Sequence, residues 1–124
     1  MSGIMTMEVA RGQAYREWAR GLRVTVVGLA RSGVAACRLL REIGASVIAT
    51  DMKPKGELSP EARDLERSGV DLRVGDHPAI AFHDRDLIVL SPGVASDLPV
   101  LQRARERGVP VIGTVGGAAV RDCP

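Results

Sequence analysis

A glycine-rich turn, Gly28-Leu-Ala-Arg-Ser-Gly33, is the first place in the sequence where residue types and spacing indicate chemistry. Glycines at both ends let the backbone turn sharply and come close to a phosphate group. Between them, Ser32 offers a hydroxyl donor, and Arg31 offers a guanidinium that can lie over a base or a phosphate. A helix that begins at such a turn points its free N–H groups at the same phosphate. The turn therefore predicts binding of a phosphorylated ligand.

A carboxylate and two cations follow at the end of the next apolar run, Val47-Ile-Ala-Thr-Asp51. In nucleotide-binding β-α-β units an acidic residue at this place accepts hydrogen bonds from ribose hydroxyls. Lys53 and Lys55 are the only lysines of the chain, and both come directly after Asp51. Their charges suit a phosphate, but the two lysines can equally form an exposed loop face, and Asp51 can also be a solvated turn residue. The glycine turn and Asp51 together indicate a nucleotide without saying which one.

A third loop, Ser91-Pro-Gly93, interrupts the aliphatic run Asp86-Leu-Ile-Val-Leu90. Its glycine lets the backbone pass under a ligand, although the loop can also be a simple chain reversal. His77 and His83 have no partnered nucleophile and no metal-ligand spacing, so we expect both at the surface. The Gly-x-x-x-x-Gly-Lys-Ser/Thr phosphate loop of ATPases is absent. The residues predict neither a catalytic centre nor a metal site.

Alternating strands and helices must bring these three loops together. We expect strands at 23–28, 46–51, 71–74, 86–90 and 109–112, and helices at 32–43, 60–68 and 99–107, with a weak helical segment near 78–82. This alternation predicts an α/β, Rossmann-like, doubly wound sheet of five parallel strands in the order 3-2-1-4-5. The carboxyl ends of strands 1, 2 and 4 then meet at a crevice. The tail, 113–124, is expected to be half helical.

Composition fits one small domain of 124 residues, 45% hydrophobic and 26% charged. Aromatic residues make up only 2%, so the core must be aliphatic, as in a buried parallel sheet. A net charge of +2 gives no reason to expect a nucleic acid or a membrane partner. The two cysteines lack metal spacing, and we expect a buried, reduced Cys37, a cytoplasmic protein and a monomer.

Residues 1–21 stand outside the β-α-β pattern and lack the apolar stretch of a signal peptide. Tyr15 and Trp18, three residues apart, predict a short amphipathic helix over about 8–20. We expect this N-terminal arm to pack against the sheet, with a contact between copies of the chain as the alternative.

Taken together, these motifs resemble the N-terminal domain of the Mur ligases, and most of all the branch that adds D-glutamate. The resemblance rests on the glycine turn, Asp51 and the motif Asp86-Leu-Ile-Val-Leu-Ser-Pro-Gly-Val94, and it covers about residues 22–115. The last motif is its specific part. In that family the domain holds the UDP portion of a nucleotide-sugar, here expected to be UDP-N-acetylmuramoyl-L-alanine.

The resemblance implies that Arg31 and Ser32 contact the uracil and diphosphate. Residues 51–53 would flank the uridine, and residues 91–93 would form the floor beneath it. The implied UDP site comprises Gly28, Leu29, Arg31, Ser32, Gly33, Asp51, Met52, Lys53, Ser91, Pro92 and Gly93. It also implies that the complete ligase uses ATP and Mg²⁺ to activate a carboxylate before D-glutamate attacks it. Because that chemistry belongs to central and C-terminal domains, we expect residues 22–124 to be a UDP-binding fragment that is inactive alone.

Two alternatives stay open. The first is an NAD(P)-binding domain of an oxidoreductase, because the turn differs from the dinucleotide fingerprint only in having Ala30 as its middle residue. The second is a non-catalytic nucleotide-binding module, such as a coenzyme A-binding domain. Ser91-Pro-Gly93 favours the ligase, whereas Thr114-Val-Gly-Gly117, where the family often has an acidic residue, departs from its pattern.

Overall fold

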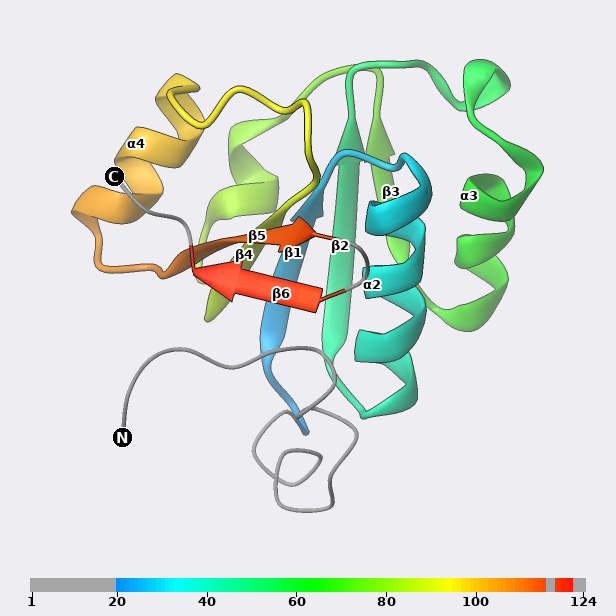
Figure 1. Cartoon of the computed structure of the whole chain (residues 1–124), viewed down its shortest axis with the longest axis horizontal. Coiled ribbons are helices and arrows are strands. Elements are labelled where there is room, and N and C mark those ends of the chain that lie inside the picture. The colour runs from blue at the N-terminus through cyan, green and yellow to red at the C-terminus, as the bar shows by residue number, and fades with distance from the viewer. Residues whose placement is uncertain (1–19, 116–117, 122–124) are drawn as a thin grey trace.

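Six strands form a single sheet in the order β3-β2-β1-β4-β5-β6 (Figure 1). The computed structural model describes residues 20–115 and 118–121. The strands are β1 (Arg23–Val27), β2 (Ser46–Asp51), β3 (Asp71–Val74), β4 (Leu87–Leu90), β5 (Val111–Val115) and β6 (Ala118–Arg121). The first five pair in parallel, which confirms the predicted Rossmann-like order 3-2-1-4-5.

The sixth strand corrects the expectation for the tail. β6 pairs antiparallel with β5, and Val115 lies opposite Ala118. The helix predicted within 113–124 is therefore wrong for the described part of this segment. Two glycines separate the strands in the sequence, and such a spacing between apolar runs is typical of a β-hairpin.

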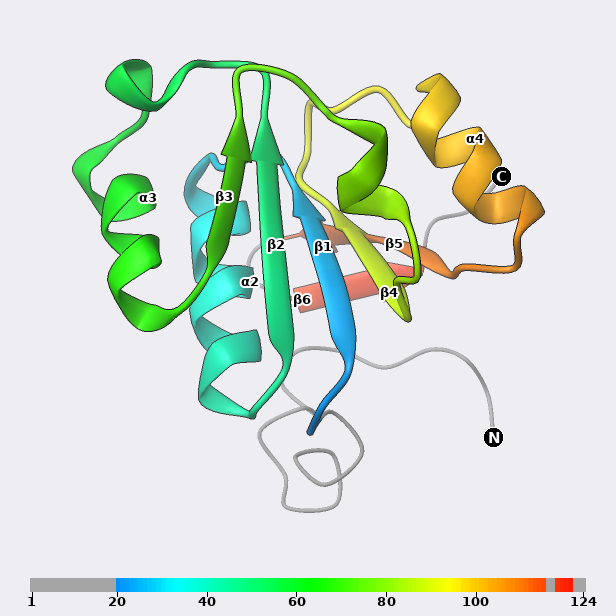
Figure 2. The same ribbon diagram turned by 180° about the vertical axis from the view of Figure 1, so that it is seen from behind.

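Helices cover both faces of the sheet (Figures 1 and 2). On one face lie α2 (Arg31–Glu42) and α3 (Pro60–Asp64), and on the other lie η4 (Ala79–Phe82) and α4 (Pro99–Glu106). Two further single-turn 3₁₀ helices, η2 (Lys55–Glu57) and η3 (Leu65–Ser68), flank α3. The helices predicted at 32–43 and 99–107 are confirmed, whereas the one at 60–68 changes from α to 3₁₀ geometry halfway.

The core follows the alternation of side chains along the strands. Val24 and Val26 of β1 point to the α2 face and pack with Leu40. Val27 points the other way and packs with Leu101 of α4. These side chains are almost fully buried, as an aliphatic parallel sheet with helices on both faces requires.

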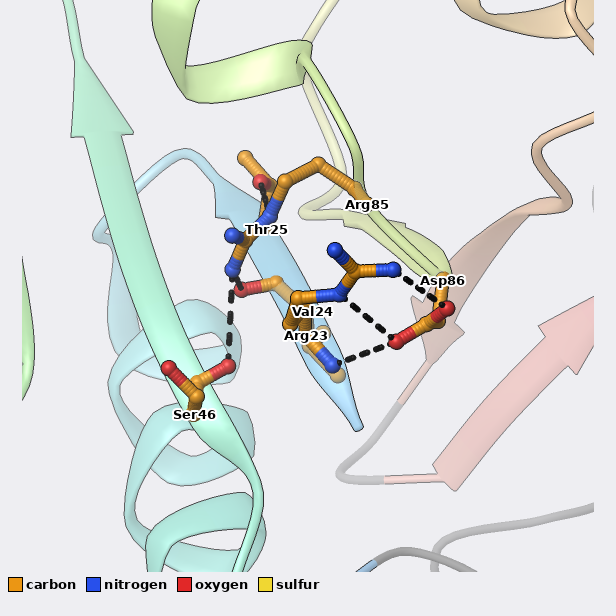
Figure 3. Close-up of polar contacts among 6 residues, drawn as sticks. All are labelled: Arg23, Val24, Thr25, Ser46, Arg85 and Asp86. Carbon is orange, nitrogen blue, oxygen red and sulfur yellow. Dashed lines mark hydrogen bonds and ion pairs between the residues drawn. The ribbon is translucent and has the colours of Figure 1, made fainter. Parts of the chain in front are cut away.

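Hydrogen bonds to side chains join β1 and β4 at their amino ends. The Asp86 carboxylate accepts from the Arg23 backbone N–H at 2.8 Å and from its guanidinium at 3.3 Å. These contacts hold the pKa of Asp86 below its ordinary value. Figure 3 shows the Arg85 guanidinium turned to β1, where it donates to the Thr25 hydroxyl at 3.0 Å and the Val24 carbonyl at 2.9 Å. The end of the sheet opposite the three loops is thus closed by polar contacts.

The N-terminal arm at 1–21 and its helix at 8–20 fall almost wholly outside the described residues, so both stay predictions. Arg20 and Gly21 are described, and the Gly21 N–H donates to the Gly44 carbonyl beyond the end of α2 at 3.1 Å. Within the described ranges, no helix has both the length and the apolar character needed to cross a membrane.

Cys37 lies on the inner face of α2 with 0% of its surface exposed, which confirms the predicted buried thiol. Burial raises the pKa of Cys37 to about 12, because a thiolate there would lose its hydration.

In a Cys123→Ser variant, we expect iodoacetamide at pH 8 to leave Cys37 unmodified until urea unfolds the domain. Mass spectrometry measures the modification. Rapid modification of Cys37 without urea would contradict the packing of α2.

Candidate functional site

A groove of about 880 Å³ opens where β1, β2 and β4 end. It lies between β1 and β4, at the point where the strand order reverses, which is the usual ligand site of an open α/β sheet. Eight of the predicted site residues line it: Gly28, Leu29, Arg31, Asp51, Lys53, Ser91, Pro92 and Gly93. The structure thus brings the three loops singled out in the sequence to one place.

Asp51 lies in the groove with both carboxylate oxygens in contact with backbone donors. Oδ2 accepts from the Leu29 N–H at 2.7 Å, and Oδ1 accepts from the Lys53 N–H at 2.9 Å. A carboxylate has about four acceptor positions, so each oxygen keeps one for a ligand hydroxyl or N–H. Asp51 is therefore held in place and remains able to accept from a ligand.

The first turn of α2 is open to an anion. The helix begins at Arg31, no side chain caps its N-terminus, and its first turn contains no acidic residue. The N–H groups of such a turn carry a partial positive charge and attract phosphate or carboxylate. Arg31 and Lys53 add full positive charges to the lining of the groove. Among the described residues, neither side chain forms an ion pair.

The glycine turn is packed too closely for larger residues. Gly28 has φ +93°, a left-handed conformation that favours glycine. A Cβ added to Gly33 would lie 1.9 Å from the Gly28 carbonyl oxygen and 2.6 Å from the Ser91 Oγ. Ser91 is 3% exposed, and its hydroxyl donates to that carbonyl at 2.7 Å. The ends of β1, α2 and β4 are therefore in direct contact beneath the groove.

Not every predicted residue lines the groove. Gly33 is buried beneath the turn, Ser32 is half-buried beside it, and neither belongs to the lining. Met52 points into solvent with 60% of its surface exposed. Lys55 forms an ion pair with Glu66 of η3, away from the groove. These residues lie within the expected loops in the sequence. Gly33 is covered by the turn, and the side chains of the other three residues lie outside the lining of the groove.

The groove also extends along α2 to residues that were not predicted. Its further lining comprises Ala30, Val34, Ala35, Arg38, Glu57, Leu58, Ser59, Glu61 and Val94. Arg38 comes seven residues after Arg31, a spacing that puts both on one face of a helix and could have revealed it. Glu57 and Glu61 lie on the side of η2 and α3, so the groove has a basic wall and an acidic wall.

His77 is less exposed than the predicted surface position. Its ring is half-buried, and Nδ1 lies 2.9 Å from the hydroxyl of Thr50, which is fully buried at the end of β2. Burial lowers the pKa of His77, and the negative charges of Asp51 and Asp76 partly oppose this shift. His83 is exposed, as predicted. In the described part of the chain, no group of three or more His, Cys, Asp or Glu side chains could hold a metal ion.

The sheet order and the groove at its switch point define a Rossmann-like domain with a polar ligand site. The model of the family "Mur ligase MurD-like, N-terminal domain" matches residues 22–113, and the chain belongs to this family. Among curated relatives, the UDP-N-acetylmuramoylalanine--D-glutamate ligase of Koribacter versatilis is 45% identical over 100 residues, 81% of this chain and 22% of that protein. The ligase of the same name from Anaeromyxobacter dehalogenans is 50% identical over 100 residues, covering 81% and 21%. The chain thus spans about a fifth of their length.

Solved structures share the fold. The UDP-N-acetylmuramate-alanine ligase MurC from Thermotoga maritima matches with a TM-score of 0.63 at 22% identity, covering 74% of this chain and 20% of that one. D-lactate dehydrogenase from Escherichia coli matches with a TM-score of 0.56 at 25% identity, covering 77% and 29%. Because a ligase and a dehydrogenase both match, the fold alone does not separate the two functions.

Gly33→Ala tests the close contact beneath the groove. A methyl group 1.9 Å from a backbone carbonyl must displace α2 or β1, so we expect a loss of at least about 2 kcal/mol in the free energy of unfolding. Gly56→Ala is the control, because a Cβ there meets nothing within 4 Å and should change stability by less than about 0.5 kcal/mol. Urea unfolding followed by circular dichroism measures both, and equal midpoints would contradict the contact.

His77 should make stability depend on pH. Its pKa is lowered in the folded state from 6.5, so the unfolded chain takes up the proton first as the pH falls. The free energy of unfolding should therefore not depend on His77 above about pH 6.5 and should decrease as the pH falls below it. We expect His77→Gln to flatten this decline in urea midpoints between pH 7.5 and 5, and His83→Gln to keep it. A decline that is the same in both variants would assign the effect to other groups.

Proposed function

We propose that this domain binds the uridine diphosphate part of UDP-N-acetylmuramoyl-L-alanine. The membership of the family and the names of the relatives support this ligand. The groove of about 880 Å³ lies within the range of small-molecule sites and suits a ligand of nucleotide size. Its apolar lining, including Val34, Leu58 and Val94, offers surfaces for a base or a sugar ring.

The observation that carries the proposal is the separation of anion-binding and donor-binding groups across the glycine turn. The uncapped turn of α2, with Arg31 beside it, attracts negative charge, whereas the Asp51 carboxylate repels it and accepts donors. A nucleoside diphosphate carries both kinds of group in one molecule, with phosphates at one end and ribose and base donors at the other. It can therefore satisfy both sides of the groove without placing a phosphate against Asp51.

The described residues then have separate tasks in binding. The N–H groups at the start of α2 hold a phosphate, and Arg31 and Lys53 neutralise its charge. Asp51 accepts from the ribose or the base, fixed for this purpose by the Leu29 and Lys53 N–H groups. The backbone of Pro92 and Gly93 forms the opposite side of the groove.

We further propose that the domain serves a longer ligase that joins D-glutamate to this substrate at the expense of ATP. The described residues do not fit ATP with Mg²⁺: they contain no cluster of metal-ligating side chains, and the glycine turn lacks the Gly-Lys-Ser/Thr sequence of ATPase loops. We therefore assign no step of the ATP chemistry to this domain. The cytoplasmic location and the monomeric state stay predictions.

An NAD(P)-binding function is the second candidate. It is favoured by the position of Asp51 at the end of β2. The fold is compatible with it, because the chain shares this fold with D-lactate dehydrogenase and with L-tryptophan dehydrogenase from Nostoc punctiforme. The latter matches with a TM-score of 0.57 at 20% identity, covering 90% of this chain and 31% of that one, so it shows the fold alone. The two candidates differ in the ligand that the same groove would hold.

Calorimetric titration of the chain with UDP, UDP-N-acetylmuramoyl-L-alanine and NADH tests the proposal. We expect the two uridine ligands to bind and NADH not to bind. Asp51→Asn should weaken UDP binding about tenfold, or about 1.4 kcal/mol, because its amide group cannot accept from both backbone N–H donors and the ligand. Asp71→Asn is the matched control, because Asp71 lies at the start of β3, at the other end of the sheet.

The outcomes separate the candidates. Binding of NADH without UDP would replace the proposal with the dinucleotide function. Binding of UDP that is equally weakened by Asp51→Asn and Asp71→Asn would show that Asp51 has no specific contact with the ligand. Absence of binding for all three ligands would contradict a UDP site in this chain.

A further inference from the structure

We infer that Ser91 is a positioning residue that fixes the peptide plane between Gly28 and Leu29 and does not itself touch the ligand. This inference rests on the proposed function, because it concerns how the UDP site is shaped. The resemblance assigns Ser91 to the floor beneath the uridine. The hydrogen bonds of the structure give its hydroxyl a different task.

The hydroxyl of Ser91 is already occupied. A serine hydroxyl has one hydrogen, and here it is donated to the Gly28 carbonyl at 2.7 Å. The side chain is 3% exposed, and the position that a Gly33 Cβ would take lies 2.6 Å from its oxygen. The bond to Gly28 uses the only hydrogen of the hydroxyl. Ser91 lines the groove, but burial and the contact with α2 restrict the access of a ligand to the lone pairs of its oxygen.

The carbonyl that Ser91 holds belongs to the same peptide unit as the Leu29 N–H. A peptide unit is planar, so its C=O and N–H point in opposite directions and turn together. The Leu29 N–H donates to the Asp51 Oδ2 at 2.7 Å. One rigid plane is therefore held at its oxygen by the loop after β4 and at its nitrogen by the last residue of β2.

The peptide plane before it, between Val27 and Gly28, is held in a similar way, because the Val27 carbonyl accepts from the Ser91 backbone N–H at 2.9 Å. The Gly28 N–H of that preceding plane donates to the Thr50 carbonyl of β2 at 2.8 Å, so both planes connect β2 with the end of β4. Loss of the Ser91 hydroxyl would leave the buried Gly28 carbonyl without its hydrogen-bond partner. The plane could then rotate, which would weaken the bond from Leu29 to Asp51 and shift the carboxylate that faces the ligand.

Thr25, in the middle of β1, provides a control. It is also fully buried, and its hydroxyl also donates to a backbone carbonyl, that of Ala81. Thr25→Val and Ser91→Ala each remove one buried hydroxyl and its bond to a carbonyl, and Thr25→Val also removes the bond that Arg85 donates to that hydroxyl. A purely structural role predicts that both variants lose stability and that neither changes the turn.

Amide hydrogen exchange of the unliganded domain, measured by NMR, tests the inference without any ligand. We expect Ser91→Ala to speed exchange of the Leu29 amide at least about tenfold relative to the Val26 amide, which reports global opening. Thr25→Val should leave that ratio unchanged. If Ser91→Ala does not fold, Ser91→Cys, a weaker donor of similar shape, should give an intermediate increase. An unchanged ratio in the folded Ser91 variant would overturn the inference.

UDP titration completes the test. We expect Ser91→Ala to weaken binding about tenfold, Thr25→Val to leave it unchanged, and Ser91→Ala with Asp51→Asn to lose less than the product of the single losses, since both act on one plane. Weaker binding with unchanged Leu29 exchange would mean that the hydroxyl touches the ligand, which overturns the positioning role. If the unaltered chain does not bind UDP, the proposed function fails, while the exchange measurement still decides the role of Ser91.

Discussion

Backbone packing between Gly28 and Gly33 is the constraint on which the site depends. The Gly28 carbonyl oxygen lies only 1.9 Å from the position that a Cβ of Gly33 would take, so α2 can begin directly against the end of β1 only because Gly33 lacks a side chain. This close start places the N-terminus of α2 at the mouth of the groove. The same contact brings the Ser91 Oγ within 2.6 Å of that position, which connects β4 to the turn. Three elements thus meet at a point that admits no larger residue.

The two ends of the sheet differ in role: polar contacts close the amino ends, and the groove lies at the carboxyl ends. At the amino ends, polar groups are bonded to one another (Figure 3). Asp86 accepts from Arg23, and Arg85 donates to the Thr25 hydroxyl. At the carboxyl ends, the cations of Arg31 and Lys53 line an open groove without an ion pair among the described residues. Exposed, unpaired charges contribute little to stability and stay available to a ligand. The arrangement is what a binding domain with its site at one end requires.

The sequence was sufficient to predict the parallel order and the three loops, because aliphatic runs and glycine ends report directly on buried strands and turns. It did not predict the partial burial of His77. This burial results from a contact with Thr50 of β2, which is distant in the sequence, and no local pattern carries that information. Arg38 was missed for the opposite reason: its spacing from Arg31 was visible, but only the cavity shows that this helix face borders the site. The pairing of β5 with β6 could not be predicted, because glycines in this tail give it little preference for any secondary structure.

The shared fold of ligases and dehydrogenases directs attention to the middle residue of the glycine turn. In dinucleotide-binding domains a glycine at this place lets the backbone approach the pyrophosphate. Ala30 occupies it here with φ −72° and ψ −175°, an extended conformation that any residue adopts, so the turn itself does not need glycine. Ala30 is exposed and lines the groove, so its methyl group stands where dinucleotide-binding domains have a glycine. In the proposed complex, the N–H groups at the start of α2 and Arg31 would hold the phosphates. Asp51 and the loop after β4 would then recognise the nucleoside.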